Sequence, residues 1–305
     1  MTVDEAARII QSGGVVAFPT ETVYGLGANA LDPEAILRIY ELKQRPSTSP
    51  LIVHVESIEM AQALASDWPL AAEGLARRYW PGPLTIVVRK GEMIPDEATA
   101  GLATVGLRMP SHPLALELIR ACGVPLAAPS ANPFTRLSPT TAAHVREAFG
   151  DKVPVLDGGP TQIGIESTVV SVVDGGITLL RPGMLTIAGA KTGLTVVGGA
   201  HASNFQSRAH TAPGQHHKHY SPRTPVILLD AADPVPEGAA YVWHSISKPS
   251  SKAVRMPDDP AGYAAKIYSV LHDLDNRDLP AIAIERVPGD ERWVGLADRL
   301  RRAAG

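Results

Sequence analysis

Cysteine is almost absent from this chain of 305 residues, since Cys122 is the only one. Counting therefore excludes an intramolecular disulfide and a cysteine-rich zinc site. Aromatic residues make up only 5% of the sequence, which argues against a stacking platform for single-stranded nucleic acid. Basic residues are not in excess either, because 28 Lys and Arg against 31 Asp and Glu give a formal net charge of -3. This balance disfavours a protein that coats nucleic acid, although it leaves room for a local basic pocket.

Long apolar runs are also missing. No stretch approaches the roughly 18 to 20 continuous apolar residues that a membrane span requires. The first residues, MTVDEAARII, lack the basic and apolar regions of a signal peptide. We therefore expect a cytoplasmic protein without a membrane partner. Its 45% hydrophobic and 19% charged residues are typical of a globular chain with one large core or two smaller ones.

Several common catalytic signatures are absent from the sequence. It contains no GxxxxGK[ST] loop, no GxGxxG between a strand and a helix, and no HExxH, GxSxG or CxxC motif. Neither a P-loop nor a dinucleotide-binding fingerprint is therefore predicted. The sequence also indicates no covalent enzyme nucleophile.

Short β-rich runs alternate with helical patterns as far as residue 181. Strands are expected at residues 13–20, 51–55, 84–89, 103–108, 125–131, 167–173 and 177–181, and helices at 2–12, 32–43, 57–65, 71–79, 112–122 and 140–149. The glycine-rich segment 21–31 is expected to be a structured loop. Only a short turn separates the last two strands, which predicts an antiparallel hairpin and hence a mixed sheet in an α/β domain.

A change in composition near residue 188 predicts a domain boundary. Residues 188–219 are rich in Gly, Ala, Ser, Thr and His without periodicity, as in a linker. Beyond them, strands are expected at 224–230, 239–245 and 280–287, and helices at 263–275 and 297–305. We therefore predict a catalytic domain over residues 1–188, a linker over 189–222 and a smaller α/β domain over 223–305.

Polar side chains stand at the ends of the predicted strands, where sites in α/β proteins are usually assembled. They are Thr20, Thr22, Arg108, Ser130, Asn132 and Arg181. Arg108 and Arg181 fit either a site or ion pairs at the surface. Lys43 and Arg45 lie one residue apart in a proline-braced loop, where two cations can clamp a triphosphate. They can equally favour the dipole of the preceding helix.

Threonines and histidines give less specific signals. Thr140 and Thr141 stand where a helix N-terminus attracts an anion, but either can simply cap the helix. His54 alternates with valines along its strand, which is more typical of a structural histidine. The four histidines of segment 210–220 lack a carboxylate partner, which argues against a metal site there.

Taken together, the motifs resemble those of the threonylcarbamoyl-AMP synthase family in its long form, which is built on a YrdC-like domain. PTETVYGLG, KQRP, PLIVHV, WPGPLT, VGLRMP, APSAN, IESTVV and LRPG follow the family's order and cover nearly all of residues 1–185. HYSP at 219–222 is similar to the family's linker motif, and MPDDPAGYAAKIYSVLHDLD and DRLRRAA are similar to its C-terminal domain. The resemblance implies a YrdC-like twisted mixed sheet with surrounding helices around a basic cavity, plus a smaller C-terminal Rossmann-like α/β domain.

The resemblance also implies a reaction. A nucleotidyltransferase of this family forms threonylcarbamoyl-AMP and pyrophosphate from L-threonine, bicarbonate and ATP. ATP and bicarbonate are then substrates, and Mg²⁺ is expected to be carried by the nucleotide. The product supplies the N6-threonylcarbamoyl group of a modified adenosine in tRNA. The expected partners are therefore the three substrates and the tRNA threonylcarbamoyl-transfer machinery, with room for a weak contact to tRNA itself.

Site residues follow from the resemblance by motif position. L-threonine is assigned to Thr22, His54, Arg108, Ala128 and Ser167. The nucleotide is assigned to Arg45, Ser49, Thr104, Ser130, Asn132, Ser138, Arg181 and Tyr220. Lys43 and Arg45 are expected to neutralise the phosphates during catalysis, and no residue is assigned to a metal ion. Ser49 stands where the family commonly has Asn, and Tyr220 is expected to fold back with the linker as a lid over the nucleotide.

Two other functions fit part of the pattern. A carbamoyltransferase of the hydrogenase-maturation type also carries a YrdC-like domain, but it adds cysteine zinc modules that one cysteine cannot build. A noncatalytic RNA-binding module would use the same basic cavity. The net charge of -3 disfavours that module, and the threonine-site pattern would then be unexplained.

Overall fold

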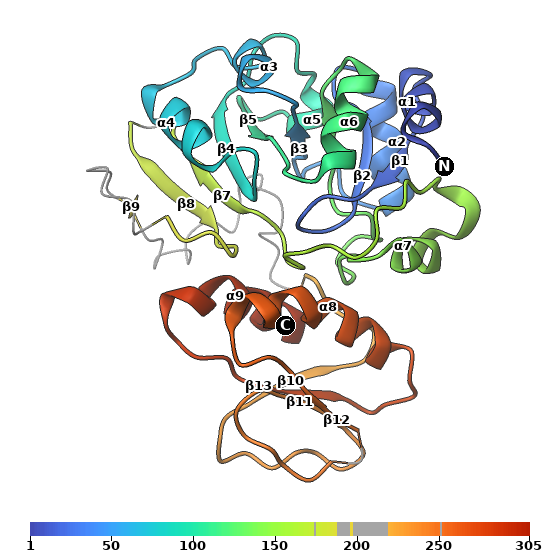
Figure 1. Ribbon diagram of the computed structural model, residues 1–305, viewed down its shortest axis with the longest axis vertical. Coiled ribbons are helices and arrows are strands. Elements are labelled where there is room, and N and C mark those ends of the chain that lie inside the picture. The colour runs from blue at the N-terminus through green and yellow to red at the C-terminus, as the bar shows by residue number, and fades with distance from the viewer. Residues whose placement is uncertain (174, 188–195, 198–218, 251) are drawn as a thin grey trace.

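Two β-sheets with their helices organise the chain, one above the other in Figure 1. The computed structural model describes residues 1–173, 175–187, 196–197, 219–250 and 252–305. The first sheet holds β1 (Val16–Phe18), β2 (Gly25–Asn29), β3 (Ile52–His54), β4 (Leu84–Arg89), β5 (Thr104–Arg108), β6 (Leu126–Ala127), β7 (Thr168–Ser171), β8 (Ile177–Arg181) and β9 (Val196–Val197). The second sheet holds β10 (Val226–Leu229), β11 (Ala240–Trp243), β12 (Ala253–Arg255) and β13 (Ile282–Glu285).

The first sheet is mixed, as the sequence predicted. Its strand order is β1-β2-β6-β3-β5-β4-β7-β8-β9. β3 pairs with β5 in parallel and β4 pairs with β7 in parallel, whereas β4 and β5 are antiparallel. β7 and β8 form the predicted antiparallel pair. The β3–β5 register sets His54 beside Arg108, so residues far apart in sequence meet at the ends of central strands.

Apolar side chains project from both faces of this sheet. Along β1, Val16 and Phe18 pack in the core under α1 (Val3–Gln11) and α6 (Pro113–Cys122), whereas Ala17 belongs to the larger core. Successive residues of a strand point to opposite faces, so both faces need helices to cover them. The larger core includes buried residues of α2 (Pro33–Lys43), α3 (Ile58–Ala63), α4 (Leu70–Tyr79), α5 (Asp96–Thr99) and α7 (Ala142–Phe149).

The helices begin at the capping residues that the sequence predicts. Thr2 and Glu5 form a reciprocal capping box at the start of α1. Asp32 accepts bonds from the first backbone amides of α2, whose first residue is Pro33. Thr141 accepts a bond from the amide of His144 and so caps α7. For Thr141 the capping interpretation is therefore confirmed.

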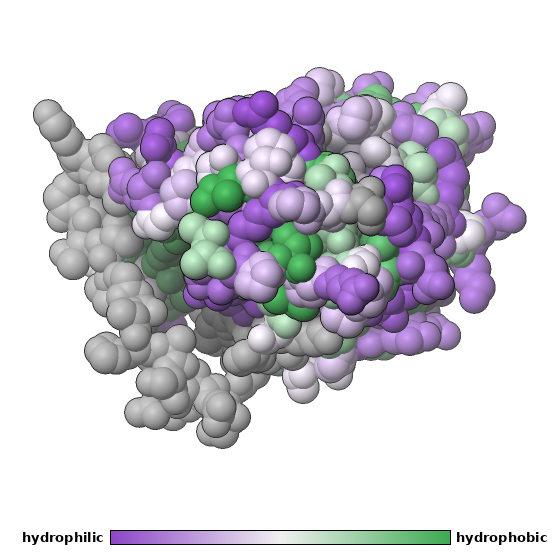
Figure 2. Space-filling model, turned by 90° about the horizontal axis from the view of Figure 1, so that it is seen from below, coloured by the Kyte–Doolittle hydropathy of each residue, from purple (hydrophilic) through white to green (hydrophobic). Residues whose placement is uncertain are grey.

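The second sheet is parallel and carries its helices on one side. Its strand order is β10-β13-β11-β12, and each neighbouring pair runs in parallel. α8 (Pro260–Asp275) and α9 (Val294–Ala304) lie on the face turned toward the first domain (Figure 1). Figure 2 views the molecule from below, at the end formed by the second sheet and its loops, where hydrophilic residues surround small apolar areas. The smaller domain therefore meets the larger one through its helices.

The contact between the two domains is close enough to involve backbone. A Cβ atom on Gly295 of α9 would lie 2.4 Å from the carbonyl oxygen of Gly183, and one on Gly164 would lie 2.2 Å from that of Ala264. Gly164 also has a φ of +84°, which favours glycine. Polar contacts add to this packing, since the hydroxyls of Thr140 and Ser269 are 2.9 Å apart.

Some local expectations were wrong. Segment 21–31, expected to be a loop, contains β2, which pairs with β1 and β6. Glycines suit this strand because the ring of Phe18 lies 2.5 Å from where a Cβ of Gly27 would be. Three elements, α5, β9 and β12, were not expected from the sequence. Apart from residues 196–197 and 219–222, the predicted linker and lid lie outside the described residues, and so do its histidines other than His219.

Candidate active site

A cavity lies where strands β3, β5 and β8 end. Its lining combines polar side chains from the first sheet with two residues of the HYSP segment. The lining residues are Thr20, Thr22, Val23, Gly25, Arg45, Ile52, His54, Arg108, Ala128, Pro129, Ser130, Glu166, Arg181, His219 and Tyr220. Three arginines therefore face a single hollow whose other walls are largely apolar or hydroxylic.

The structure brings many of the predicted site residues together. Those that line the cavity are Thr22, His54, Arg108 and Ala128 from the threonine set, and Arg45, Ser130, Arg181 and Tyr220 from the nucleotide set. Those outside the lining are Lys43, Ser49, Thr104, Asn132, Ser138 and Ser167. Thr20, which the sequence placed among the strand-end polar residues, also lines the cavity. The sequence assigned no role to three polar residues at the site: Glu166 and His219 in the lining and Glu21 behind it.

Arg108 anchors one end of the cavity. It is 4% exposed, and its Nη2 donates to Glu21 Oε1 at 2.7 Å and to Thr22 Oγ1 at 2.9 Å. The other oxygen of Glu21 accepts from the backbone amide of Ser111 at 3.1 Å. Arg108 Nε is buried and has no hydrogen-bond partner among the residues described. The guanidinium is thus fixed by Glu21 while keeping a donor for a further acceptor.

His54 lies next to Arg108 as a neutral imidazole. Burial, with repulsion from Arg108, lowers the pKa of His54 to about 3. Its Nδ1 is buried without a hydrogen-bond partner in the described part of the chain, and its ring meets the edge of Phe18 with centroids 6.1 Å apart. A neutral imidazole in this position can bond to a polar ligand without adding charge.

This neutral state predicts an acid-sensitive fold. The unfolded chain protonates His54 near pH 6.5, whereas the folded protein does so only near pH 3, so the stability is full above 6.5 and falls as pH drops toward 3. Between pH 7 and pH 4 the wild-type free energy of unfolding should fall by about 3 kcal/mol more than that of His54→Asn. Urea unfolding at both pH values measures this, and equal losses would contradict it.

Arg45 lines another part of the cavity, and its hydrogen-bond partners are uncharged. Its Nη2 donates to Ser49 Oγ at 2.7 Å and to the Pro50 carbonyl at 3.0 Å, and its Nε to the Ser49 carbonyl at 3.3 Å. Burial lowers the pKa of Arg45 to about 10, with a further lowering by Arg181. It stays charged at neutral pH. A buried cation held by neutral oxygens, with a second cation near, favours an anionic ligand.

Arg181, which the resemblance assigns to the nucleotide, is held by Ser167, which the resemblance assigns to L-threonine. Its Nε and Nη2 donate to the Ser167 carbonyl at 3.1 and 3.0 Å, and Nη2 also reaches Ser167 Oγ at 3.0 Å. The hydroxyl of Ser167 lies 2.8 Å from that of Thr85. Ser167 therefore orients Arg181, although it does not line the cavity itself.

Lys43 is enclosed by protein rather than exposed to the cavity. Its ammonium donates to the Ser130 carbonyl at 2.6 Å and to the Asn132 carbonyl. Burial, and next the charge of Arg45, lowers its pKa well below the ordinary value. In this geometry Lys43 holds the loop that carries Ser130, which lines the cavity.

The remaining predicted residues lie around the cavity. Thr104 lines a small adjoining pocket, and Ile52 lines both that pocket and the main cavity. Ser138 donates to Glu166. Asn132 lines a groove on the side of α8, where its amide bonds to the carbonyls of Pro133 and Arg136.

Known proteins match this chain from end to end. A family model for Sua5, YciO and YrdC proteins, described as "Telomere recombination", matches residues 8–183, and one described as "Threonylcarbamoyl-AMP synthase, C-terminal domain" matches residues 184–305. The threonylcarbamoyl-AMP synthase of Pyrococcus abyssi is 41% identical over 321 residues, which cover 98% of this chain and 93% of that protein. The chain belongs to the threonylcarbamoyl-AMP synthase family.

A second relative and a solved structure support the assignment of this chain to the threonylcarbamoyl-AMP synthase family. The synthase of Bacillus subtilis is 37% identical over 325 residues, covering 99% of this chain and 92% of the relative. The crystal structure of P. abyssi Sua5 complexed with L-threonine matches with a TM-score of 0.91 and 38% identity, covering 99% of this chain and 94% of that one. The resemblance and the fold class drawn from the sequence are therefore confirmed.

Among the described residues, no three His, Cys, Asp or Glu side chains are grouped so as to hold a metal ion. Over the same part of the chain, every helix is too short or too polar to span a bilayer.

Proposed function

We propose that this chain is a threonylcarbamoyl-AMP synthase, which forms threonylcarbamoyl-AMP and pyrophosphate from L-threonine, bicarbonate and ATP. One observation carries the proposal: a single cavity lined by Arg108 and also by Arg45 and Arg181. Such a cavity suits an amino-acid carboxylate and a polyphosphate bound side by side. Membership of the synthase family supports this assignment of substrates.

L-threonine binds at Arg108 in this proposal. The spare Nε donor of Arg108 meets the threonine carboxylate, while the hydroxyl of Thr22 and the imidazole of His54 supply polar contacts. Ala128 forms part of the cavity wall and offers its backbone groups to threonine. Because His54 is neutral at physiological pH, it does not compete with Arg108 for the carboxylate.

ATP binds beyond threonine, with its phosphates at Arg45 and Arg181. Ser130 and Tyr220 complete this part of the lining. Ser49 and Ser167 act behind the arginines by orienting them, and Lys43 fixes the loop of Ser130. Thr104 lies at the adjoining pocket, and Asn132 and Ser138 act from outside the cavity. Mg²⁺ arrives with the nucleotide as part of the substrate.

The reaction follows from this placement. The threonine amine combines with CO₂ from bicarbonate to give a carbamate, and a carbamate oxygen attacks the α-phosphorus of ATP. The bond to the β-phosphate oxygen breaks, and pyrophosphate leaves with that electron pair. No covalent bond to the protein is needed, so the protein contributes by aligning the reactants and neutralising phosphate charge. The product passes to the tRNA threonylcarbamoyl-transfer machinery, and we place the reaction in the cytoplasm.

Pyrophosphate release tests the proposal directly. Purified protein with ATP, Mg²⁺ and bicarbonate should release pyrophosphate when L-threonine is added. Release should be at least tenfold slower with L-serine or L-valine, because contacts from Thr22 and His54 recognise both the hydroxyl group and the shape of the threonine side chain. Release without bicarbonate, or equal release with all three amino acids, would refute the assignment. In a parallel filter-binding assay, tRNA binding without turnover would favour the RNA-binding alternative.

A further inference from the structure

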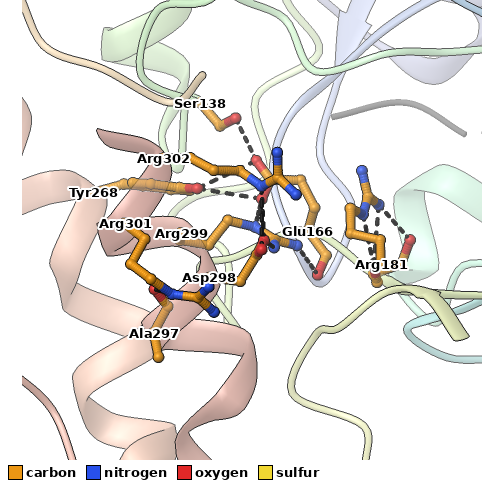
Figure 3. Close-up of polar contacts among 10 residues, drawn as sticks. Ser138, Glu166, Arg181, Tyr268, Ala297, Asp298, Arg299, Arg301 and Arg302 are labelled. Carbon is orange, nitrogen blue, oxygen red and sulfur yellow. Dashed lines mark hydrogen bonds and ion pairs between the residues drawn. The ribbon is translucent and has the colours of Figure 1, made fainter. Parts of the chain in front are cut away.

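Glu166 is a buried carboxylate at the boundary between the two domains. It is 7% exposed, lines the cavity and precedes β7 by two residues. Its Oε1 accepts from Ser138, and its Oε2 accepts from Tyr268 at 3.2 Å and from Arg299 Nε at 2.6 Å (Figure 3). Two of these three donors, Tyr268 and Arg299, come from the C-terminal domain.

A carboxylate in this position works against nucleotide binding. Burial raises the pKa of Glu166, but attraction by Arg299 and Arg181 and the bond from Ser138 outweigh burial and lower it, so the group is ionised at neutral pH. An ionised carboxylate repels phosphate, and beside Arg181 it competes with phosphate for the guanidinium. Binding of a triphosphate in this cavity therefore requires that the charge of Glu166 be neutralised.

Arg299 supplies the opposite charge from the last helix of the chain. It is 1% exposed, and besides its bond to the Glu166 carboxylate it donates to Asp298 Oδ2 at 2.7 Å and to the Glu166 carbonyl at 3.4 Å. Its guanidinium carbon lies 5.0 Å from the ring centroid of Tyr220, which lines the cavity. Arg299 thus pairs with two carboxylates: Glu166, and Asp298, which has a second cation in Arg302.

We infer that Arg299 is a positioning residue for ATP: by neutralising and holding Glu166, it keeps the charge of that carboxylate away from the phosphates. The inference rests on the proposed function, to which it adds a role for the C-terminal domain. That domain completes the electrostatics of a cavity built mainly by the N-terminal domain. The threonine end at Arg108 has its own carboxylate partner, Glu21, and should not depend on Arg299.

The test measures binding of two ligands to the full-length protein. Arg299→Gln should weaken binding of α,β-methylene-ATP with Mg²⁺ by about ten- to a hundredfold in titration calorimetry, because a charge-assisted contact is lost and Glu166 is left unpaired. L-threonine binding should change less than about twofold. Arg301→Gln is the matched control on the same helix, since Arg301 is exposed and bonds to the Ala297 carbonyl (Figure 3). It should leave both affinities unchanged.

Removal of the carboxylate separates charge from packing. Glu166→Gln alone should bind the ATP analogue at least as tightly as the wild type, and the double variant Glu166→Gln/Arg299→Gln should recover to within about threefold of it. If Arg299→Gln does not fold, these two variants still decide the matter. Weaker binding in Glu166→Gln, no recovery in the double variant, or equal loss of both ligands would overturn the inference. A wild type that binds neither ligand would instead overturn the proposed function.

Discussion

Arg108→Gln should reduce kcat/KM for L-threonine by about a thousandfold while changing KM for ATP less than about threefold. The substitution removes the cation for the threonine carboxylate, and it leaves Glu21, only 2% exposed, without its opposite charge. Truncating one partner of a buried charge pair formed with a bound ligand costs about 2 to 5 kcal/mol of binding free energy, and each 1.4 kcal/mol is tenfold in kcat/KM. Pyrophosphate release at varied threonine and ATP measures both constants.

Two further variants make this result interpretable. Arg120→Gln is the matched control, because Arg120 forms an exposed pair with Glu56 on the outside of α6. It should leave both kinetic constants within about 1.5-fold of the wild type. Glu21→Gln/Arg108→Gln removes both charges, so it should fold more stably than Arg108→Gln and still use threonine poorly. Equal losses in threonine and ATP kinetics for Arg108→Gln would argue against the assignment of this end to threonine.

Arg45→Gln should have the opposite selectivity, with KM for ATP raised by about a hundredfold and KM for threonine nearly unchanged. Arg45 is buried and donates to uncharged oxygens of Ser49 and Pro50, so its removal leaves no unpaired carboxylate behind. What is lost is the charge-assisted contact with phosphate, worth about 1.5 to 3 kcal/mol. The same pyrophosphate assay and direct titration with the ATP analogue measure the effect.

Arg77→Gln provides the control for Arg45→Gln. Arg77 is an exposed residue of α4 that pairs with Glu73 one helical turn away, and it should affect neither substrate. If Arg45→Gln raised KM for threonine as much as KM for ATP, the two ends of the cavity would not be separate sites. The proposed division of the cavity would then be wrong.

Local patterns in the sequence predicted most of the elements because their causes are local. Short runs of β-favouring residues predicted the strands, and capping residues such as Thr2 and Asp32 predicted helix starts, since each depends on neighbours within four residues. The segment with β2 was mistaken for a loop because its glycines are required by a contact with Phe18 in another strand. That requirement is tertiary and leaves no periodic signal.

The site was predictable to the extent that motifs mark it. The sequence left open whether Arg108 and Arg181 belong to a site or to surface ion pairs. Both line one cavity, because strand register brings strand ends together, as it does for His54 and Arg108. The two carboxylates were not foreseen, although both lie inside quoted motifs. Glu166 and Arg299 are 133 residues apart, and no local pattern reports their ion pair. Likewise, only the fold reveals that Lys43 turns inward to backbone carbonyls.

The near contact of Gly295 with Gly183 limits how this protein can be recombined with its relatives. With only 2.4 Å between the Gly183 carbonyl and the place of a Cβ on residue 295, a chimaera whose grafted helix carries alanine there has to shift the whole helix outward. Such a shift would also withdraw the following turn of the helix. A grafted C-terminal half therefore has to bring glycine at position 295 with it.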